Sequence, residues 1–316
     1  MIRILANDGI HADALMLLEE ASIEVVTTKI PQDELIQKLQ DFDGIIVRSA
    51  TKVRKELIEA CPRLKIIVRA GVGLDNVDVD FAKSKNISVF NTPGASTRAV
   101  AELTLAHIFA LSRNLHTANR SLAGKNPDFA ALKKSLAGGM ELKDKTVGII
   151  GFGRIGQELA KLCLPMGMKV IAYDPYVDKG VIHYDVFGDT AIKLTVEITT
   201  TDFNKVIQKA DFICVHISGK DVIIGKEQML QMKKGACLIN TSRGGVISES
   251  DLIEMLDNGH LGGAALDVFT NEPNPNPALL NHPKISVTPH IGAETKEAQV
   301  KIAMELADKI IHFFEN

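Results

Sequence analysis

The sequence predicts an α/β protein with parallel sheets covered by helices, organised as two domains. Short apolar runs alternate with segments of helical spacing almost from end to end, which is typical of strands joined by crossover helices. A chain of 316 residues is long for one globular domain. The strand-like runs also fall into two series, separated by an apolar helix and a Gly-, Lys- and Ser-rich stretch.

The first series occupies the N-terminal part of the chain. We expect its strands near 2–6, 23–27, 44–48, 64–69 and 87–90. An apolar helix follows, roughly from Thr97 to Ala118. It is too apolar for a solvated linker, so we expect it to pack against a neighbour such as a second subunit. We interpret the stretch between Gly124 and Leu142 as an irregular arm or loop.

The second series starts at Lys145. We expect its strands at 145–150, 168–173, 211–217, 236–241, 262–267 and 285–288. A last helix, over about 292–315, carries apolar residues on one side. The stretch from His183 to Thr201 contains alternating apolar residues, and we interpret it as a surface hairpin or an irregular loop.

Composition excludes several classes of function. The 36 basic and 39 acidic residues give a formal charge of −3, and no basic stripe indicates nucleic-acid binding. The four cysteines form no C-x-x-C pair, so we expect neither a metal site nor a disulfide. No apolar run approaches the roughly 20 residues that span a bilayer. We therefore expect a cytoplasmic protein that acts on a small molecule.

A glycine motif, Gly151-Phe-Gly153-Arg-Ile-Gly156, marks the start of the second series. The glycine pattern alone is weak evidence, but here an apolar strand precedes it and an amphipathic helix follows it. The first glycine allows a tight turn, the second lets a pyrophosphate approach the backbone, and the third lets the helix pack closely on the strand. The helix N-terminus then favours the phosphates. The motif predicts a dinucleotide site.

Asp174 indicates which dinucleotide is bound. It stands at the end of the next predicted strand, eighteen residues beyond Gly156. A carboxylate there accepts hydrogen bonds from ribose hydroxyls and repels a 2′-phosphate. No arginine directly follows it, because the next residues are Pro175 and Tyr176. We therefore expect NAD as the cofactor and not NADP.

Three further segments place polar side chains at or just beyond the carboxyl ends of predicted strands, where open α/β sheets collect ligands. Arg243, in Asn-Thr-Ser-Arg-Gly-Gly, suits a substrate carboxylate through its bidentate fork. His290, in Thr-Pro-His-Ile-Gly, titrates in the range of a proton acceptor, and Glu272 can orient its imidazole. Taken singly, an arginine is usually a surface charge, a histidine is more often structural than catalytic, and Glu272 would be an acid in a loop.

These motifs, in this order, resemble those of the D-2-hydroxyacid dehydrogenases. The resemblance implies two Rossmann-like doubly wound parallel-sheet domains, with the cofactor domain inserted in the substrate domain. It implies a substrate-binding domain over 1–96 and 287–316 and an NAD-binding domain over 97–286. It also implies the catalytic residues Arg243, Glu272 and His290. The implied cofactor contacts are Val72, Gly151, Gly153, Arg154, Ile155, Gly156, Asp174, Thr241, Ser242, Asp267 and Gly292.

The N-terminal half is most similar to the phosphoglycerate dehydrogenase branch of that family. The similarity lies in Val-Arg48-Ser-Ala-Thr and in Val-Arg69-Ala-Gly71-Val72-Gly73. These residues, with Arg243, are the implied substrate site. The Gly71–Gly73 turn can offer N–H groups to a carboxylate, and the arginines Arg48 and Arg69 suit a phosphate as well. Inter-domain ion pairs are the alternative role for the two arginines.

The resemblance implies NAD-dependent oxidation of 3-phospho-D-glycerate to 3-phosphohydroxypyruvate, the first step of serine biosynthesis. The alternatives are a glyoxylate or hydroxypyruvate reductase, another D-2-hydroxyacid dehydrogenase, or an NAD-sensing scaffold that binds other proteins. We expect a homodimer. We also expect a short form without a C-terminal serine-sensing domain, and hence no serine feedback through such a domain.

Overall fold

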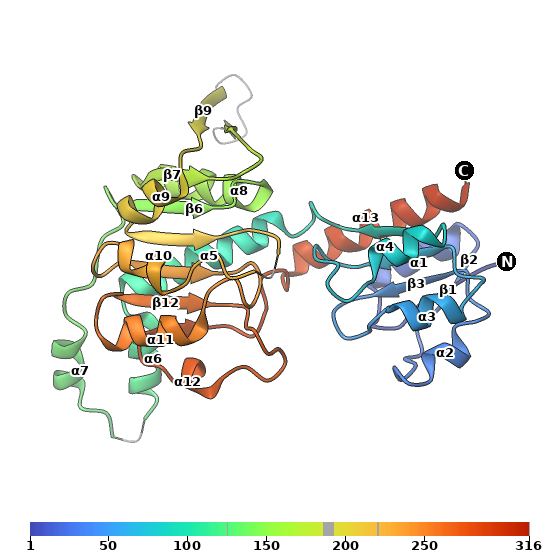
Figure 1. Ribbon diagram of the computed structural model, residues 1–316, viewed down its shortest axis with the longest axis horizontal. Helices are drawn as coiled ribbons and strands as arrows, with labels where there is room; N and C mark the ends of the chain where they lie inside the picture. The colour runs from blue at the N-terminus through green and yellow to red at the C-terminus, as the bar shows by residue number, and fades with distance from the viewer. Residues whose placement is uncertain (125, 186–192, 220, 316) are drawn as a thin grey trace. The chain divides into compact units, whose positions relative to one another are not determined.

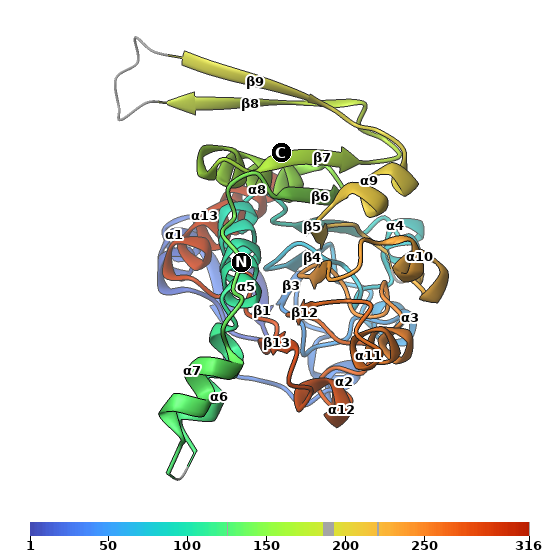
Figure 2. The same cartoon turned by 90° about the vertical axis from the view of Figure 1, so that its left-hand side faces the viewer.

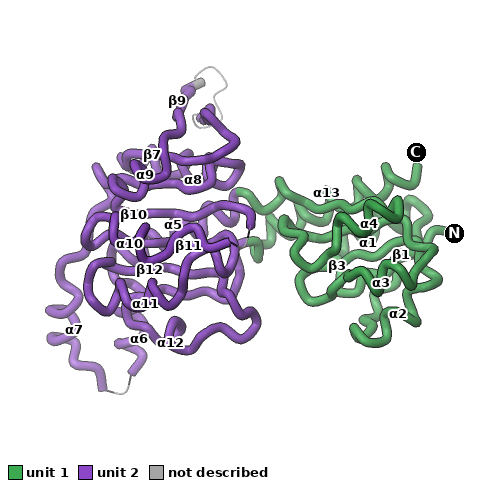
Figure 3. The backbone as a smooth tube through the Cα atoms, in the orientation of Figure 1, with its two compact units in different colours: residues 1–97, 293–316 green, residues 98–292 purple. Residues whose placement is uncertain are grey.

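A computed structural model describes residues 1–124, 126–185, 193–219 and 221–315 (Figures 1 and 2). The chain forms two compact units, residues 1–97 with 293–316 and residues 98–292, which Figure 3 distinguishes by colour. Each unit has its own parallel sheet with helices on both faces, and the second unit is inserted in the sequence of the first. The predicted fold class is therefore confirmed.

The first unit is built on a five-stranded parallel sheet in the order β2-β1-β3-β4-β5. Its strands are β1 (Ile2–Ala6), β2 (Ile23–Val26), β3 (Gly44–Val47), β4 (Ile66–Arg69) and β5 (Ser88–Asn91). All five overlap the runs expected from the sequence. The chain reverses direction across the sheet between β1 and β3, and a ligand crevice is expected at such a switch point.

Helices cover both faces of this sheet (Figure 1). On one face α1 (Ala12–Glu20) and α13 (Lys296–Glu315) share a core with the sheet. On the other face the core is closed by α2 (Leu35–Lys38), α3 (Lys55–Ala60) and α4 (Val79–Ser84). The last helix begins at Lys296 and not near 292, because the Thr295 hydroxyl accepts a hydrogen bond from the Ala298 N–H and caps it.

The second unit contains a six-stranded parallel sheet in the order β13-β12-β11-β10-β6-β7. Its switch point lies between β6 and β10, so the loops that follow these two strands meet. The strands overlap the second predicted series, and they are β6 (Thr146–Ile150), β7 (Lys169–Tyr173), β10 (Phe212–Val215), β11 (Cys237–Asn240), β12 (Gly263–Leu266) and β13 (Ile285–Val287).

Two buried clusters hold the helices of this unit to its sheet. The first face packs against α5 (Thr97–Ser112) and α8 (Arg154–Cys163), which a short 3-10 turn, η1 (Leu164–Met166), extends. The opposite face is covered by α9 (Phe203–Lys209), α10 (Lys226–Gln231), α11 (Glu249–Asp257) and α12 (Pro277–Leu280). The apolar inner face of α5 is thus buried against the sheet of its own unit.

Two predicted segments differ from the structure. The helix expected over 97–118 breaks at Asn114, whose φ of 52° lies in the left-handed region, and α6 (Leu115–Leu122) starts anew. The arm expected to be irregular contains a helix, α7 (Phe129–Ser135), so this prediction was wrong for that part. The Asp128 carboxylate accepts a hydrogen bond from the Ala131 N–H and caps α7.

After β7 the chain forms a hairpin of two antiparallel strands, β8 (Lys179–Asp185) and β9 (Lys193–Thr199). The hairpin interpretation is confirmed for these strands, and residues 186–192 lie outside the described residues. Figure 2 shows the hairpin extending beyond β7. Near the end of β8 the Tyr184 hydroxyl donates to the Lys161 carbonyl of α8. Throughout the described ranges, helices are too short or too polar to cross a membrane.

Candidate active site

The glycine motif forms the loop between β6 and α8. Gly151 has a φ of +95°, and a Cβ there would lie 2.5 Å from the His216 carbonyl oxygen on the neighbouring strand end. A Cβ on Gly156 would collide with the Gly151 carbonyl oxygen. A Cβ on Gly153 would meet nothing within 4 Å, so this N-cap residue faces open space at the start of α8. A pyrophosphate can approach the backbone there, and the loop fits a dinucleotide.

Asp174 follows β7 and holds the glycine loop. Its Oδ2 accepts a hydrogen bond of 2.7 Å from the Phe152 N–H, between the first two glycines of the motif. Its Oδ1 accepts from the N–H groups of Tyr176 and Val177, at 2.8 and 3.1 Å. A carboxylate has about four lone-pair positions, so ribose hydroxyls can still bind. Asp174, which the sequence predicts to select NAD over NADP, therefore also fixes the conformation of the glycine loop.

His290 and Glu272 form a hydrogen-bonded pair. The His290 Nδ1 lies 2.7 Å from the Glu272 Oε2, and the Glu272 Oε1 accepts from the Phe269 N–H at 2.9 Å. Because an ionised carboxylate only accepts, Nδ1 carries a proton and Nε2 of the neutral ring is left as the acceptor. The His290 side chain is 48% exposed, which leaves it accessible to a substrate. The sequence prediction paired the same two residues.

The pair shifts the pKa values of both members. The hydrogen bond that His290 donates to Glu272, and then the charge of Glu272, raise the pKa of His290 above its ordinary value, against partial burial and the Arg243 charge. Burial alone would raise the pKa of Glu272, but the hydrogen bonds from His290 and the Phe269 N–H lower it, helped by the charges of His290 and Arg243. The imidazole is thus a stronger base than a free histidine.

Arg243 belongs to the loop after β11. The Asn240 side chain organises this loop, since its Nδ2 donates to the Arg243 carbonyl at 2.8 Å and its Oδ1 accepts from the Ser242 N–H and hydroxyl. Gly244 touches the Phe269 carbonyl so closely that no Cβ would fit. This contact brings the loop of Arg243 against the loop of Glu272, and the charge of Arg243 acts on the pKa values of both members of the pair.

A buried network supports the turn that carries His290, which itself has a φ of 55°. The Asp267 carboxylate accepts from the N–H groups of Ile291 and Gly292, each at 2.9 Å, and from the Thr288 hydroxyl at 2.6 Å. Thr288 in turn lies 3.1 Å from the Nε2 of His107 on α5. Burial raises the pKa of Asp267. The network fixes the backbone on the C-terminal side of His290.

His107 completes this network from the helix side. Its Nδ1 lies 3.2 Å from the Ser286 hydroxyl. The Thr288 hydroxyl donates its hydrogen bond to Asp267, so it can only accept from His107. The His107 Nε2 therefore donates to Thr288, and its Nδ1 accepts from Ser286. Burial lowers the pKa of His107 to about 4, so the ring is neutral. Sequence reasoning assigned this histidine no part in the site. On the same helix, one turn earlier, the Thr104 hydroxyl lies 2.8 Å from the Thr241 hydroxyl, a contact that only the fold reveals.

The first unit holds the other predicted substrate residues. The Arg69 guanidinium donates to the carbonyls of Gly73 and Arg48, which folds the turn at 71–73 back on β4. The Gly71 N–H donates to the Thr92 hydroxyl at 3.0 Å. Of the three N–H groups that the sequence suggested for a carboxylate, those of Val72 and Gly73 are therefore the candidate donors.

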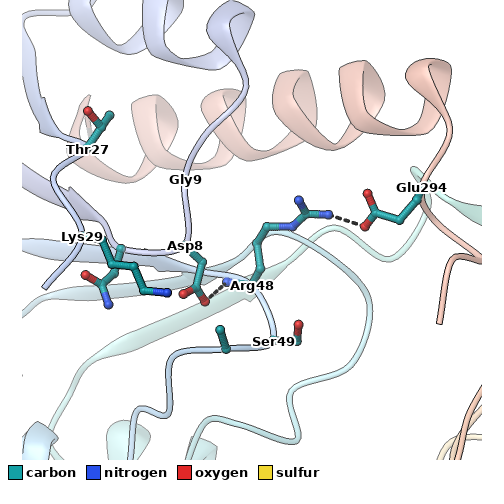
Figure 4. Close-up of a pocket in the computed structure, with 9 residues that line it drawn as sticks. Asp8, Gly9, Thr27, Lys29, Arg48, Ser49 and Glu294 are labelled. Carbon is teal, nitrogen blue, oxygen red and sulfur yellow. Dashed lines mark hydrogen bonds and ion pairs between the residues drawn. The ribbon is translucent and has the colours of Figure 1, made fainter. Parts of the chain in front are cut away.

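Arg48 lines a pocket of about 470 Å³ in the first unit (Figure 4). Its guanidinium forms an ion pair with Glu294, which precedes α13 and lines the same pocket. Spacing offered no signal for this partner, because the two residues are 246 positions apart in the chain. Among the residues that the structure describes, no cluster of His, Cys, Asp or Glu could hold a metal ion.

More than half of the chain matches a known protein family. The family model for the NAD-binding domain of D-isomer specific 2-hydroxyacid dehydrogenases matches residues 105–292. The chain is 42% identical to D-3-phosphoglycerate dehydrogenase of Methanocaldococcus jannaschii and 39% identical to that of Bacillus subtilis, over 98% and 99% of its length. It spans only 57% of the length of each of these two relatives.

A third relative is similar over its whole length. The chain is 41% identical to hydroxypyruvate reductase of Thermotoga maritima, over 98% of this chain and 97% of that one. Among solved structures, NAD-bound 3-phosphoglycerate dehydrogenase of Entamoeba histolytica matches with a TM-score of 0.78 at 29% identity, covering 100% and 96% of the two chains. NAD-bound formate dehydrogenase of Staphylococcus aureus matches with a TM-score of 0.80 at 28% identity, covering 99% and 95%.

Proposed function

Because this chain belongs to the D-isomer specific 2-hydroxyacid dehydrogenase family, we propose that it oxidises 3-phospho-D-glycerate to 3-phosphohydroxypyruvate with NAD, the first step of serine biosynthesis. The observation that carries the dehydrogenase chemistry is the hydrogen bond between His290 and Glu272, in the same unit as the glycine loop. A histidine backed by a carboxylate is the group that an alcohol needs in order to lose its proton.

The cofactor contacts follow from the glycine loop. We assign the pyrophosphate to the N-terminus of α8, at Gly151, Gly153, Arg154, Ile155 and Gly156, and the adenosine ribose to Asp174. The backbone of Val72, Thr241 and Ser242, together with Asp267 and Gly292, is assigned to the nicotinamide end. When bound, NAD supplies the ring carbon that takes a hydride from C2 of the substrate.

The three proposed catalytic residues, Arg243, Glu272 and His290, have separate roles in the reaction. His290 Nε2 accepts the proton of the C2 hydroxyl as the C2–H bond breaks, so that a carbonyl group forms. Glu272 keeps the imidazole in the required tautomer and stabilises its cation. Arg243 binds the substrate carboxylate and polarises the C2 oxygen through its fork of N–H groups. In the reverse direction His290 returns the proton.

We assign the substrate-binding role to the unit of residues 1–97 with 293–316 and the NAD-binding role to the unit of residues 98–292. These bounds differ by a few residues from those that the sequence suggested, 1–96 with 287–316 and 97–286. In the first unit the N–H groups of Val72 and Gly73 are the candidate donors to a carboxylate. Arg48 and Arg69 are the candidate cations for a phosphate.

We further propose a homodimer, because α5, α6 and α7 leave large apolar side chains exposed, namely Phe109, Leu115, Leu122 and Phe129.

A second candidate is reduction of hydroxypyruvate or glyoxylate. The specific observation in its favour is the ion pair of Arg48 with Glu294, which already neutralises one of the two cations offered to a phosphate. The relative from Thermotoga maritima, which the chain matches almost from end to end, carries the name of this activity.

A coupled assay with NADH distinguishes the two candidates. Purified protein is given a series of 2-oxo acids with and without a 3-phosphate, and the catalytic efficiency kcat/KM is measured for each. Our proposal expects 3-phosphohydroxypyruvate to be the best substrate. A higher efficiency with hydroxypyruvate supports the second candidate, and the absence of turnover with every acid contradicts both.

A further inference from the structure

The pocket of the first unit lies at the switch point of its sheet. Its lining comes from the segments that follow β1, β2 and β3, together with Glu294. Strands β1 and β3 are neighbours from which the chain leaves in opposite directions, and open α/β sheets bind ligands at this position. The pocket is therefore where the first unit is best placed to receive a small polar molecule.

Its charged side chains balance one another. Two cations, Lys29 and Arg48, and two carboxylates, Asp8 and Glu294, line it. In Figure 4 the Arg48 guanidinium points at Glu294, and the Lys29 ammonium points toward Asp8. A site for a phosphate dianion normally has an excess of positive charge. This pocket has no excess of positive charge as long as Glu294 is ionised.

The two carboxylates have different tasks. Asp8 is occupied by the protein itself, because it accepts hydrogen bonds from the N–H groups of Arg48 and Thr51 and from the Thr51 hydroxyl, at 2.7, 3.0 and 2.7 Å. It holds the loop after β3. The Glu294 side chain bonds only to Arg48 among the residues described in the structure. Glu294 is therefore the carboxylate that sets the charge offered to a ligand.

The ion pair itself adds little to the stability of the fold. The side chains of Arg48 and Glu294 are 37% and 45% exposed, and ion pairs at such positions stabilise proteins only weakly. A change at Glu294 can thus alter ligand binding without unfolding the unit. The opposite would hold for Asp8, whose three hydrogen bonds build the loop.

We propose that Glu294 tunes substrate specificity by neutralising Arg48, so that the pocket prefers a phosphate over an uncharged group on the carbon remote from the substrate carboxylate less strongly than it would with Glu294 uncharged. A phosphate has to take the guanidinium from Glu294 and then remain close to a like charge. This inference rests on the proposed function, since it takes Arg48 as a cation offered to the phosphate of the substrate. It identifies Glu294 as the residue that sets the balance between the two candidate activities.

The test compares wild type with Glu294→Gln, which keeps the shape of the side chain and removes its charge. The quantity measured is the ratio of kcat/KM for 3-phosphohydroxypyruvate to kcat/KM for hydroxypyruvate. We expect Glu294→Gln to raise this ratio about tenfold, as removal of one like charge near a dianion should. In an Arg48→Gln background the same change should raise the ratio less, because it still relieves the repulsion by Glu294 but releases no guanidinium.

Glu297→Gln is the matched control, because it removes an exposed charge three positions further along, at a residue that does not line the pocket. An unchanged ratio in Glu294→Gln, or an equal rise in Glu297→Gln, overturns the proposal. Calorimetric titration of 3-phosphoglycerate onto the same proteins separates it from the proposed function. If no variant turns over either acid, the proposed function fails. Tighter binding to Glu294→Gln alone then still supports the role of Glu294, and equal binding to all three proteins contradicts it.

Discussion

At the scale of single residues, the Glu272 carboxylate controls both the orientation and the basicity of His290. Its hydrogen bond fixes Nδ1 as the protonated nitrogen and raises the pKa of the imidazole. Oxidation of an alcohol requires neutral His290, and reduction of a 2-oxo acid requires its protonated form. The rate of oxidation should therefore rise as pH increases through the raised pKa, while the rate of reduction falls over the same interval.

Replacing Glu272 with Gln should shift the pH dependence of both reaction directions to lower pH. Loss of the charge lowers the pKa of His290, so the alkaline fall of the reductive kcat/KM shifts to lower pH, and the acid limb of oxidation shifts the same way. We also expect kcat to fall about 100-fold. The measurement is a pH profile of both directions. Glu249→Gln is the control, since that carboxylate accepts from the neighbouring Thr270 N–H; a Glu272→Gln profile that coincides with it would contradict the assignment.

Asp174 gives a second prediction at this scale. Asp174→Ala removes the acceptor for the ribose hydroxyls and the charge that repels a 2′-phosphate, so the ratio of kcat/KM with NAD to kcat/KM with NADP should fall at least about tenfold. Part of the loss should appear with both cofactors, because Asp174 also holds the Phe152 N–H of the glycine loop. Steady-state kinetics with each cofactor measure this ratio. Asp178→Ala, at an exposed neighbouring carboxylate, should leave it unchanged.

At the scale of secondary-structure elements, α5 supports the turn that carries His290 through the buried imidazole of His107. A pKa depressed to about 4 means that the unfolded chain binds the proton more readily than the folded one. His107 should therefore lower the free energy of unfolding as pH falls from about 6.5 to about 4, by about 3 kcal/mol in total.

Denaturant titrations of wild type and His107→Gln at several pH values measure this effect. Glutamine keeps one donor and one acceptor for Ser286 and Thr288 but has no proton to gain, so its stability should depend less on pH in this interval. Curves that run parallel for the two proteins would show that His107 is not the titrating group.

The elements themselves divide into those that the sequence predicts well and those that it does not. Both strand series and the glycine loop follow from local periodicity, because each buried parallel strand is a short apolar run with its own helix after it. The break at Asn114 and the helix α7 depend on single capping or left-handed residues inside polar stretches. Such features change the periodic pattern too little to be predicted.

The candidate site shows the same division. His290 and Glu272 were paired from the chemistry of their motifs, and the family resemblance is confirmed by the matched family model. The contact of Arg48 with Glu294 and the chain from His107 to Asp267 link residues far apart in sequence. Only the fold brings these side chains together, so no spacing rule could have found them.

At the scale of the whole molecule, the homodimer can be tested on α6. Leu115 and Leu122 lie seven positions apart, hence on one face of the helix, and are 52% and 46% exposed. Light scattering should give twice the chain mass of 34.3 kDa for wild type and the single mass for Leu115→Glu with Leu122→Glu. Leu230→Glu, at a comparably exposed leucine on α10, should remain dimeric. A monomeric wild type contradicts the dimer.

The most direct test of the dehydrogenase assignment is the rate of NADH oxidation by His290→Gln with the best 2-oxo acid, measured beside the NADH dissociation constant of the same sample. We predict a kcat about 1000-fold below wild type, because the proton donor is gone, with the affinity for NADH unchanged. A variant that retains the wild-type kcat at the same NADH affinity would show that His290 does not transfer the proton.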